Sequence, residues 1–156
     1  MNRMKKAFTL VEILIVVIIL GILAAIVIPQ FTQASSDARD ASLSSDLQTL
    51  RSQLALYKVQ HGDAYPAAAT FVAQMTGKSN SDGTTTGGTL ALGPYMQTIP
   101  TNPVTNVNTL ATGAAVPATG VATGGWFYYI SADGKTANIF AYDTGSTSGG
   151  TLHVAL

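Results

Sequence analysis

A continuous apolar run dominates the N-terminal part of the chain. Residues 8–28 read FTLVEILIVVIILGILAAIVI and contain a single charged side chain, Glu12. A helix rises about 1.5 Å per residue, so a run of this length spans roughly 30 Å, the thickness of the hydrocarbon core of a membrane. The pattern therefore predicts a transmembrane helix over residues 8–30.

After this run the pattern becomes that of an amphipathic helix. Large apolar residues recur at alternating intervals of four and three, which places them on one face: Leu43, Leu47, Leu50, Leu54 and Tyr57. Residues 34–45 are small and polar, which is typical of a thin stalk, and Gly62 is a helix-ending residue. We expect the helix to continue through a stalk and amphipathic segment, residues 31–62, whose C-terminal half docks on a globular domain.

The remaining residues, 63–156, are enough for one modest domain outside the membrane. Residues 67–76 predict a short second helix. Two stretches rich in Ser, Thr, Ala and Gly, 77–89 and 105–125, are expected to be loops. Apolar side chains expected to face the long helix are Phe71, Val72, Met75, Tyr95, Met96 and Ile99.

Three segments near the C-terminus have the pattern of strands. Aromatic and β-branched residues fill 126–130 and 136–142, with the turn signal Asp133-Gly134 between them, and apolar residues alternate over 151–156. We expect a small antiparallel sheet packed on the long helix, because two or three strands alone are marginally stable. The fold class is therefore α+β.

Three basic side chains, Arg3, Lys5 and Lys6, precede the apolar run. The positive-inside rule predicts that this end stays in the cytoplasm and that the rest of the chain lies outside. A carboxylate near the centre of a spanning helix costs about 2.5 to 3.5 kcal/mol on insertion scales. A specific use of Glu12 is therefore expected.

The string KKAFTLVEILIVVIILGILAAIVIPQF, residues 5–31, resembles the N-terminal signature of prepilins. In that family a membrane peptidase cuts before the Phe and methylates the new amino group. The resemblance implies that residues 1–7 are a basic prepilin leader, that the cut falls between Ala7 and Phe8, and that Phe8 is N-methylated. The family's usual residue before the cut is Gly, so Ala7 departs from the pattern while keeping a small side chain.

The resemblance also implies assembly roles for Glu12 and Pro29. The matching Glu pairs with the N-terminal ammonium of a neighbouring subunit, and deleting one partner of such a desolvated pair costs about 3 to 5 kcal/mol. The helix around the matching proline loosens on assembly. From the residues alone, two other interpretations stay open: Glu12 reaches headgroups or water, and Pro29 marks the membrane exit. A proline inside a helix also predicts a kink or a loosened turn.

Two further passages, LALYKVQHGDAYP at 54–66 and Ile99-Pro100-Thr101-Asn102-Pro103, resemble the major, G-type pseudopilins of type II secretion systems. Those pseudopilins have Asp where this chain has Asn102. The resemblance implies a pilin-like α+β fold and a structural, non-enzymatic subunit that polymerises into a helical filament for the export of folded proteins. Implied partners are other copies of the chain, the prepilin peptidase and methyltransferase, an inner-membrane assembly platform and minor pseudopilins. The implied location is the bacterial inner membrane, with the C-terminal domain in the periplasm.

Calcium is a candidate ligand, because the C-terminal loop of major pseudopilins binds it. The candidate side chains here are Asp133 and Asp143, assisted by backbone carbonyls, although turn formation alone also explains Asp133. The chain has no Cys, one Glu and two isolated histidines, His61 and His153. This set forms no catalytic constellation, and His61 is expected at the helix end and His153 on a solvent-facing strand position.

Composition and charge indicate which partners and which stabilising interactions are available to the chain. The chain has eight basic and eight acidic side chains, and loss of residues 1–7 leaves five basic against eight acidic, a charge of −3. This balance argues against nucleic acid as a partner, since such binding needs clustered basic residues. Without cysteine, an exported domain relies on packing, hydrogen bonds or a metal.

Three alternatives remain. A type IV pilin for adhesion, motility or DNA uptake shares the N-terminal signature. A membrane-anchored binding protein could share the export signal alone. A conventional secretory signal peptide, with Ala24-Ala25 as the nearest cleavage site, fits poorly because Glu12 interrupts its apolar core.

Overall fold

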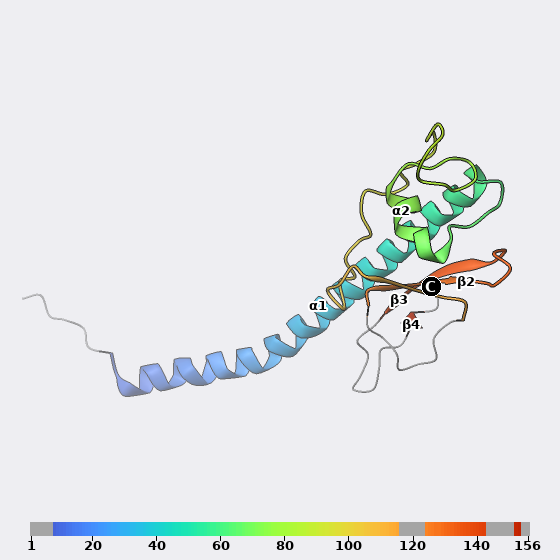
Figure 1. The fold of residues 1–156 in the computed structure, drawn as a ribbon. Helices are drawn as coiled ribbons and strands as arrows, with labels where there is room; N and C mark the ends of the chain where they lie inside the picture. The colour runs from blue at the N-terminus through green and yellow to red at the C-terminus, as the bar shows by residue number, and fades with distance from the viewer. Residues whose placement is uncertain (1–7, 116–123, 143–151, 154–156) are drawn as a thin grey trace, which may run out of the picture. The chain divides into compact units, whose positions relative to one another are not determined.

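The structure is a computed structural model that describes residues 8–115, 124–142 and 152–153. Its elements, in chain order, are α1 Leu10–Gln60, the 3-10 turn η1 Ala68–Thr70, α2 Phe71–Thr76, and the strands β1 Leu110–Gly113, β2 Trp126–Ile130, β3 Ala137–Tyr142 and β4 Leu152–His153 (Figure 1). The chain divides into two compact units, Met1–Ala38 and Arg39–Leu156.

In the first unit, the described residues belong almost entirely to the N-terminal part of α1. Its large apolar side chains are exposed, from Leu10 at 82% to Val27 at 42%. By length and composition, α1 is the one helix among the described residues that could cross a membrane. The helix is unbroken at Pro29, where the missing N–H leaves the carbonyl of Ala25 without its usual donor.

In the second unit, α1 contributes the predicted apolar stripe to the core. All five stripe residues, Leu43 to Tyr57, are 5% exposed or less. They pack with Phe71 and Met75 of α2 and with Tyr95 and Ile99. The predicted docking face of the long helix is confirmed.

The short helix α2 differs in one detail from the prediction. Phe71 and Met75 are buried, but Val72 is 47% exposed, so its predicted inward position is wrong. Residues four apart share one helix face, whereas the next residue along is turned by about 100°. Burial of Phe71 and Met75 therefore directs Val72 outward.

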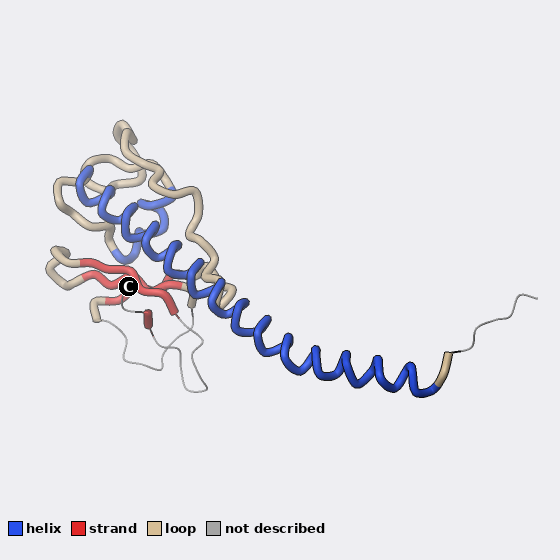
Figure 2. The backbone as a smooth tube through the Cα atoms, turned by 180° about the vertical axis from the view of Figure 1, so that it is seen from behind, coloured by secondary structure: helices blue, strands red, loops and turns tan. Residues whose placement is uncertain are grey.

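The sheet has the strand order β1-β2-β3-β4 (Figure 2). Antiparallel pairs join β2 to β3, with Trp126 opposite Ala141, and β3 to β4, with Tyr142 opposite Leu152. These pairs confirm the predicted hairpin and a third strand at Leu152–His153. The other residues of that predicted strand lie outside the described residues.

Strand β1 was not predicted. It lies within the stretch 105–125 that was expected to be a loop, and it pairs with β2 in parallel, with Leu110 opposite Trp126. The antiparallel expectation therefore holds for β2, β3 and β4, while the edge strand β1 departs from it. The strand has only four residues, Leu-Ala-Thr-Gly, which are too few to show the alternation of apolar and polar side chains that predicts a strand.

The two faces of the sheet carry separate apolar clusters. Trp126, Tyr128, Ile139 and Ala141 join the core formed with α1 and α2, and Figure 2 shows both helices on this side. Phe127, Phe140 and Tyr142 form a second buried cluster on the other face. Alternate residues of a strand point to opposite faces, which produces this division.

Candidate functional site

The predicted processing and assembly residues lie at the start of α1. Thr9 precedes the helix, and the Glu12 N–H lies 3.2 Å from the Thr9 carbonyl oxygen and 3.3 Å from its Oγ1. The Ile13 N–H donates to the same Thr9 carbonyl at 3.3 Å. Thr9 therefore acts as the helix N-cap, which explains why a Thr-x-x-Glu sequence starts the helix here.

Glu12 is exposed in the first turn of this helix. The N-terminal turn is the favourable end of the helix dipole for a carboxylate. The side chains around it are large, apolar and exposed, with Phe8 at 76% and Ile13 at 52%. The described segment thus carries one carboxylate, that of Glu12, on an otherwise apolar and exposed surface.

Ala7 lies outside the described residues, while Phe8 is the first residue described. Cleavage between them, and methylation of Phe8, stay predictions. Pro29 lies inside α1, and one turn further the Thr32 hydroxyl donates to the Ile28 carbonyl at 3.1 Å. The roles of Glu12 and Pro29 in assembly also stay predictions.

The candidate calcium ligands are only partly described. Asp133 Oδ1 accepts hydrogen bonds from the Ser131 hydroxyl and from the Lys135 N–H, at 3.1 Å for the latter. These bonds, that of Ser131 first, lower the pKa of the Asp133 carboxyl. The contacts are those of a side chain that shapes the turn between β2 and β3.

Asp143 lies outside the described residues and directly follows β3. Asp133 precedes that strand, whose six residues span about 20 Å at about 3.3 Å each. Within the described ranges, no three His, Cys, Asp or Glu residues gather as a metal-binding group. Asp143 is not among the described residues, so calcium binding by Asp133 and Asp143 remains a prediction.

Several buried polar side chains in the second unit were missed by sequence reasoning. His61 follows the last residue of α1 as expected, but it is 4% exposed. Its Nδ1 lies 2.9 Å from the Tyr57 carbonyl and its Nε2 lies 3.0 Å from Ser79 Oγ. Gln74, Ser79 and Asn102 are buried as well. Their burial depends in part on partners distant in sequence, such as Ser79 for His61 and Tyr142 for Asn102, which no local pattern indicates.

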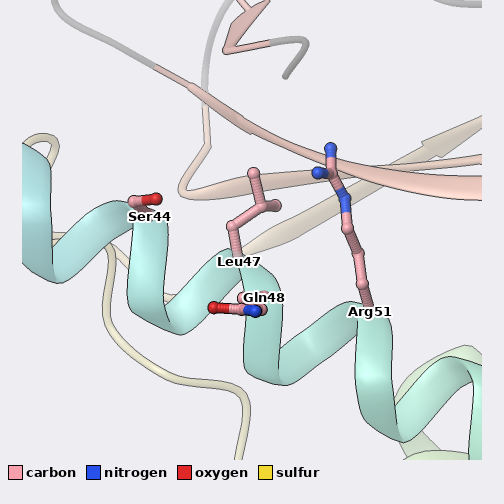
Figure 3. A pocket seen from close by; sticks show the side chains of 4 residues that line it. All are labelled: Ser44, Leu47, Gln48 and Arg51. Carbon is pink, nitrogen blue, oxygen red and sulfur yellow. The ribbon is translucent and has the colours of Figure 1, made fainter. Parts of the chain in front are cut away.

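Arg51 connects α1 to the sheet. Its Nε and Nη2 donate to the Ile139 carbonyl of β3 at 3.2 and 3.0 Å. Figure 3 shows the side chain reaching from the helix to the strands, with Leu47 one turn away and Ser44 further along the helix. These residues and Gln48 line a surface hollow of about 370 Å³. Burial lowers the pKa of the Arg51 guanidinium, and its contacts indicate a structural bridge between helix and strand.

Comparisons with known proteins converge on one type of chain. Residues 2–28 match the prokaryotic N-terminal methylation motif. The type II secretion system core protein G of Pseudomonas aeruginosa is 31% identical over 144 residues, which cover 86% of this chain and 88% of the relative. The protein of the same name from Dickeya chrysanthemi is 39% identical over 66 residues, 42% of each chain.

A filament protein of another system is also similar. The type IV narrow pilus major component PilA5 of Thermus thermophilus is 36% identical over 81 residues, covering 52% of this chain and 69% of the relative. No solved structure gives a significant match.

Proposed function

This chain belongs to the family of the type II secretion system core protein G, the G-type pseudopilins, and we propose that it polymerises into a pseudopilus that exports folded proteins. Membership follows from the similarity over nearly the full length of both chains. One observation supports the proposal most directly. The N-terminal part of α1 exposes its large apolar side chains along its length and carries a single carboxylate, Glu12, in its first turn. Such a surface is stable in a membrane or against other helices.

The mechanism begins with removal of residues 1–7, which frees the Phe8 amino group. Its ammonium charge, kept on methylation, pairs with Glu12 of a neighbouring copy. In an apolar setting each of the two charges is strongly unfavourable alone. Formation of this ion pair therefore favours the addition of a subunit and sets its register against the neighbouring subunit. The exposed apolar surface of α1 is then covered by the same segment of neighbouring copies.

The N-terminal apolar helix and the methylation motif fit a single-pass, membrane-anchored subunit. We place the basic N-terminus in the cytoplasm and residues 63–156 outside the bacterial inner membrane, in the periplasm. The partners in this proposal are further copies of the chain, a prepilin peptidase and methyltransferase, an inner-membrane assembly platform and minor pseudopilins. The function is structural, with no catalytic role for any side chain.

A charge-removing variant tests the assembly step. Glu12→Gln keeps the size of the side chain but removes its charge, so we expect filament mass, measured in sheared fractions of cells with a working assembly machine, to fall at least about tenfold. Asp40→Asn is the matched control, because Asp40 is an exposed acidic residue of α1. Equal filament yield from Glu12→Gln and the control, at equal membrane levels, would contradict the mechanism.

The similarity to PilA5 keeps a type IV pilus as the second candidate. A deletion strain separates the two. Secreted proteins that accumulate in the periplasm support the secretion pseudopilus, whereas loss of surface fibres with normal secretion supports the pilus. A processed chain that never forms filaments would instead favour a membrane-anchored binding protein.

A further inference from the structure

Arg51 is a half-buried cation whose contacts within the subunit use only part of its donors. A guanidinium has five N–H donors. Within the described ranges, the hydrogen bonds of Arg51 run from Nε and Nη2 to the neutral Ile139 carbonyl. Burial lowers the pKa of this guanidinium, and no carboxylate of the described residues raises it. In the described part of the subunit, the charge therefore lacks an anionic partner.

The hollow beside Arg51 contains further donors. Ser44, Leu47 and Gln48 line it together with Arg51 (Figure 3). The Ser44 hydroxyl and the Gln48 amide can each donate a hydrogen bond, as the guanidinium can. An ionised carboxylate only accepts, and its hydrogen bond to a guanidinium is about twice as strong as one between neutral groups. The hollow therefore has the chemistry of a carboxylate site.

Asp46 lies on the other flank of α1. Successive residues of a helix turn by about 100°, so Asp46 and Arg51 lie about 140° apart around the helix axis. The buried residues Leu47 and Leu50 lie between them. The helix thus has a half-buried carboxylate on one flank and the hollow on the other. Two such groups cannot meet within one helix, but they can meet between two copies that lie side by side.

The proposed pairing of Phe8 with Glu12 determines how far neighbouring copies are shifted. It brings Phe8 of one copy level with Glu12 of the next, a shift of four residues or about 6 Å of helix. Copies in a helical filament are related by one repeated operation, so every residue is shifted along the filament axis by the same distance. The shift brings Arg51 of the second copy level with Leu47 of the first, the residue that follows Asp46.

We propose that the hollow at Arg51 receives the Asp46 carboxylate of a neighbouring copy, so that each subunit donates Asp46 to one neighbour and receives that of another. This inference rests on the proposed function, because the shift comes from the pairing of Phe8 with Glu12 in a filament. Among the carboxylates of α1, Asp46 is nearest to this level, and the next, Asp40, precedes it by six residues. The contact joins two different surfaces, as an open filament requires.

This contact complements the pairing at the N-terminus. A single ion pair leaves a subunit free to rotate about its helix axis, whereas a second pair on the helix flank fixes that rotation. Charges that match in only one register also select the correct neighbour. Because Arg51 holds the Ile139 carbonyl of β3, the contact links the neighbouring helix to the sheet of the receiving subunit.

Chemical cross-linking of assembled filaments tests the contact, and the absence of cysteine from the chain makes it specific. Chains carrying Asp46→Cys and chains carrying Gln48→Cys are coexpressed in cells with a working assembly machine, and sheared filaments are treated with a short bis-maleimide. After the four-residue shift, the two positions lie about 3 Å apart along the filament axis. We expect a covalent dimer with one chain of each kind, and no dimer from either variant alone.

Two controls make the cross-link informative. Val59→Cys takes the place of Gln48→Cys, because Val59 is an exposed residue of the same helix but lies about 14 Å from Asp46 along the axis after the shift. This pair should give no dimer. Adding Glu12→Gln to both chains removes the pairing that drives assembly, so the dimer between Asp46→Cys and Gln48→Cys chains should then disappear.

Filament yield provides a second measurement that needs no cross-linker. Asp46→Lys places an ammonium group opposite the Arg51 guanidinium of the neighbour, so we expect filament mass to fall at least about fivefold, and that of Asp46→Asn to fall less. Asp40→Lys is the matched control, because Asp40 is exposed and lies on the same flank of the helix as Arg51. Its filament mass should stay near that of wild type. An unchanged Tm of the extracted protein shows that each variant is folded.

The outcomes separate this inference from the proposed function. A dimer with Gln48→Cys and none with Val59→Cys, together with the loss of filaments in Asp46→Lys, supports the contact. Normal filament yield from Asp46→Lys, or equal cross-linking at Val59, overturns the contact and leaves the proposed function in place. A wild-type chain that forms no filaments overturns both. If the cysteine chains do not assemble, the yield of Asp46→Lys against Asp40→Lys decides the question.

Discussion

The imidazole of His61 stacks on the phenol ring of Tyr57, with ring centroids 3.7 Å apart and planes within 7°. The Tyr57 carbonyl can only accept, so His61 Nδ1 carries the hydrogen that bonds it, while Nε2 shares a hydrogen bond with the Ser79 hydroxyl. The imidazole therefore adds a second hydrogen bond to a carbonyl of the last helical turn, which also accepts from the His61 N–H at 3.0 Å. It also ties the loop at Ser79 to the helix end.

Replacing His61 tests this arrangement. His61→Ala removes the stacked ring and its hydrogen bonds to the Tyr57 carbonyl and the Ser79 hydroxyl, so we expect a loss of about 2 to 4 kcal/mol in unfolding free energy. Val59→Ala is the control, since Val59 is a nearby exposed residue of the same helix. Chemical denaturation gives both values, and equal losses would show that the stack contributes nothing specific.

Tyr57 provides a prediction at alkaline pH. Burial, followed by the charges of Tyr95 and Asp82, raises its pKa to about 12. The neutral phenol therefore contributes stability that is present below about pH 10 and is lost as the pH rises toward the folded-state value. Tyr57→Phe should lose less unfolding free energy than wild type between about pH 9 and pH 11.5. An identical alkaline loss in both proteins would refute this assignment.

The helix stripe predicts unequal effects for two leucines of α1. Leu50 is 1% exposed and Leu56 is 44% exposed. Leu50→Ala should lower the unfolding free energy by about 2 to 5 kcal/mol because it opens a cavity in the core. Leu56→Ala should change it by less than about 1 kcal/mol. Similar losses would mean that α1 does not dock through the stripe.

Calcium binding can be tested by thermal unfolding with added calcium or chelator. The contacts of Asp133 are explained by its turn, so we expect Asp133→Ala to leave any calcium-dependent rise in Tm unchanged. Asp143→Ala is the companion variant. A rise that is lost in both variants would instead establish the site predicted from the family resemblance.

Regular periods made most of the fold predictable from sequence. The stripe from Leu43 to Tyr57 repeats with the helical period, and the alternation of Trp126 and Tyr128 follows the period of a strand. Both patterns are local, so each is visible without knowing the partner surface. Strand β1 has no such pattern. It forms by parallel pairing with β2, a contact that the residues of β1 alone do not indicate.

The buried polar groups were unpredictable for a related reason. Asn102 and His61 are buried because Gly125, Tyr142 and Ser79 come to meet them, and no sequence period records such contacts. The N-terminal site is the opposite case, because the sequence identifies its residues but the structure of one subunit does not show their partner. Its residues stand out in the sequence, but the proposed partner of Glu12 belongs to another copy of the chain, which a single subunit does not contain.

The central claim is that this chain is a processed filament subunit. Intact and N-terminal peptide mass spectrometry of the membrane-extracted protein tests it most directly. The account predicts a chain that begins at N-methylated Phe8, with residues 1–7 removed despite Ala7 at the cleavage position. An uncut terminus at Met1 would contradict it, because the Phe8 nitrogen would then be an amide with no charge to pair with Glu12 of a neighbouring subunit.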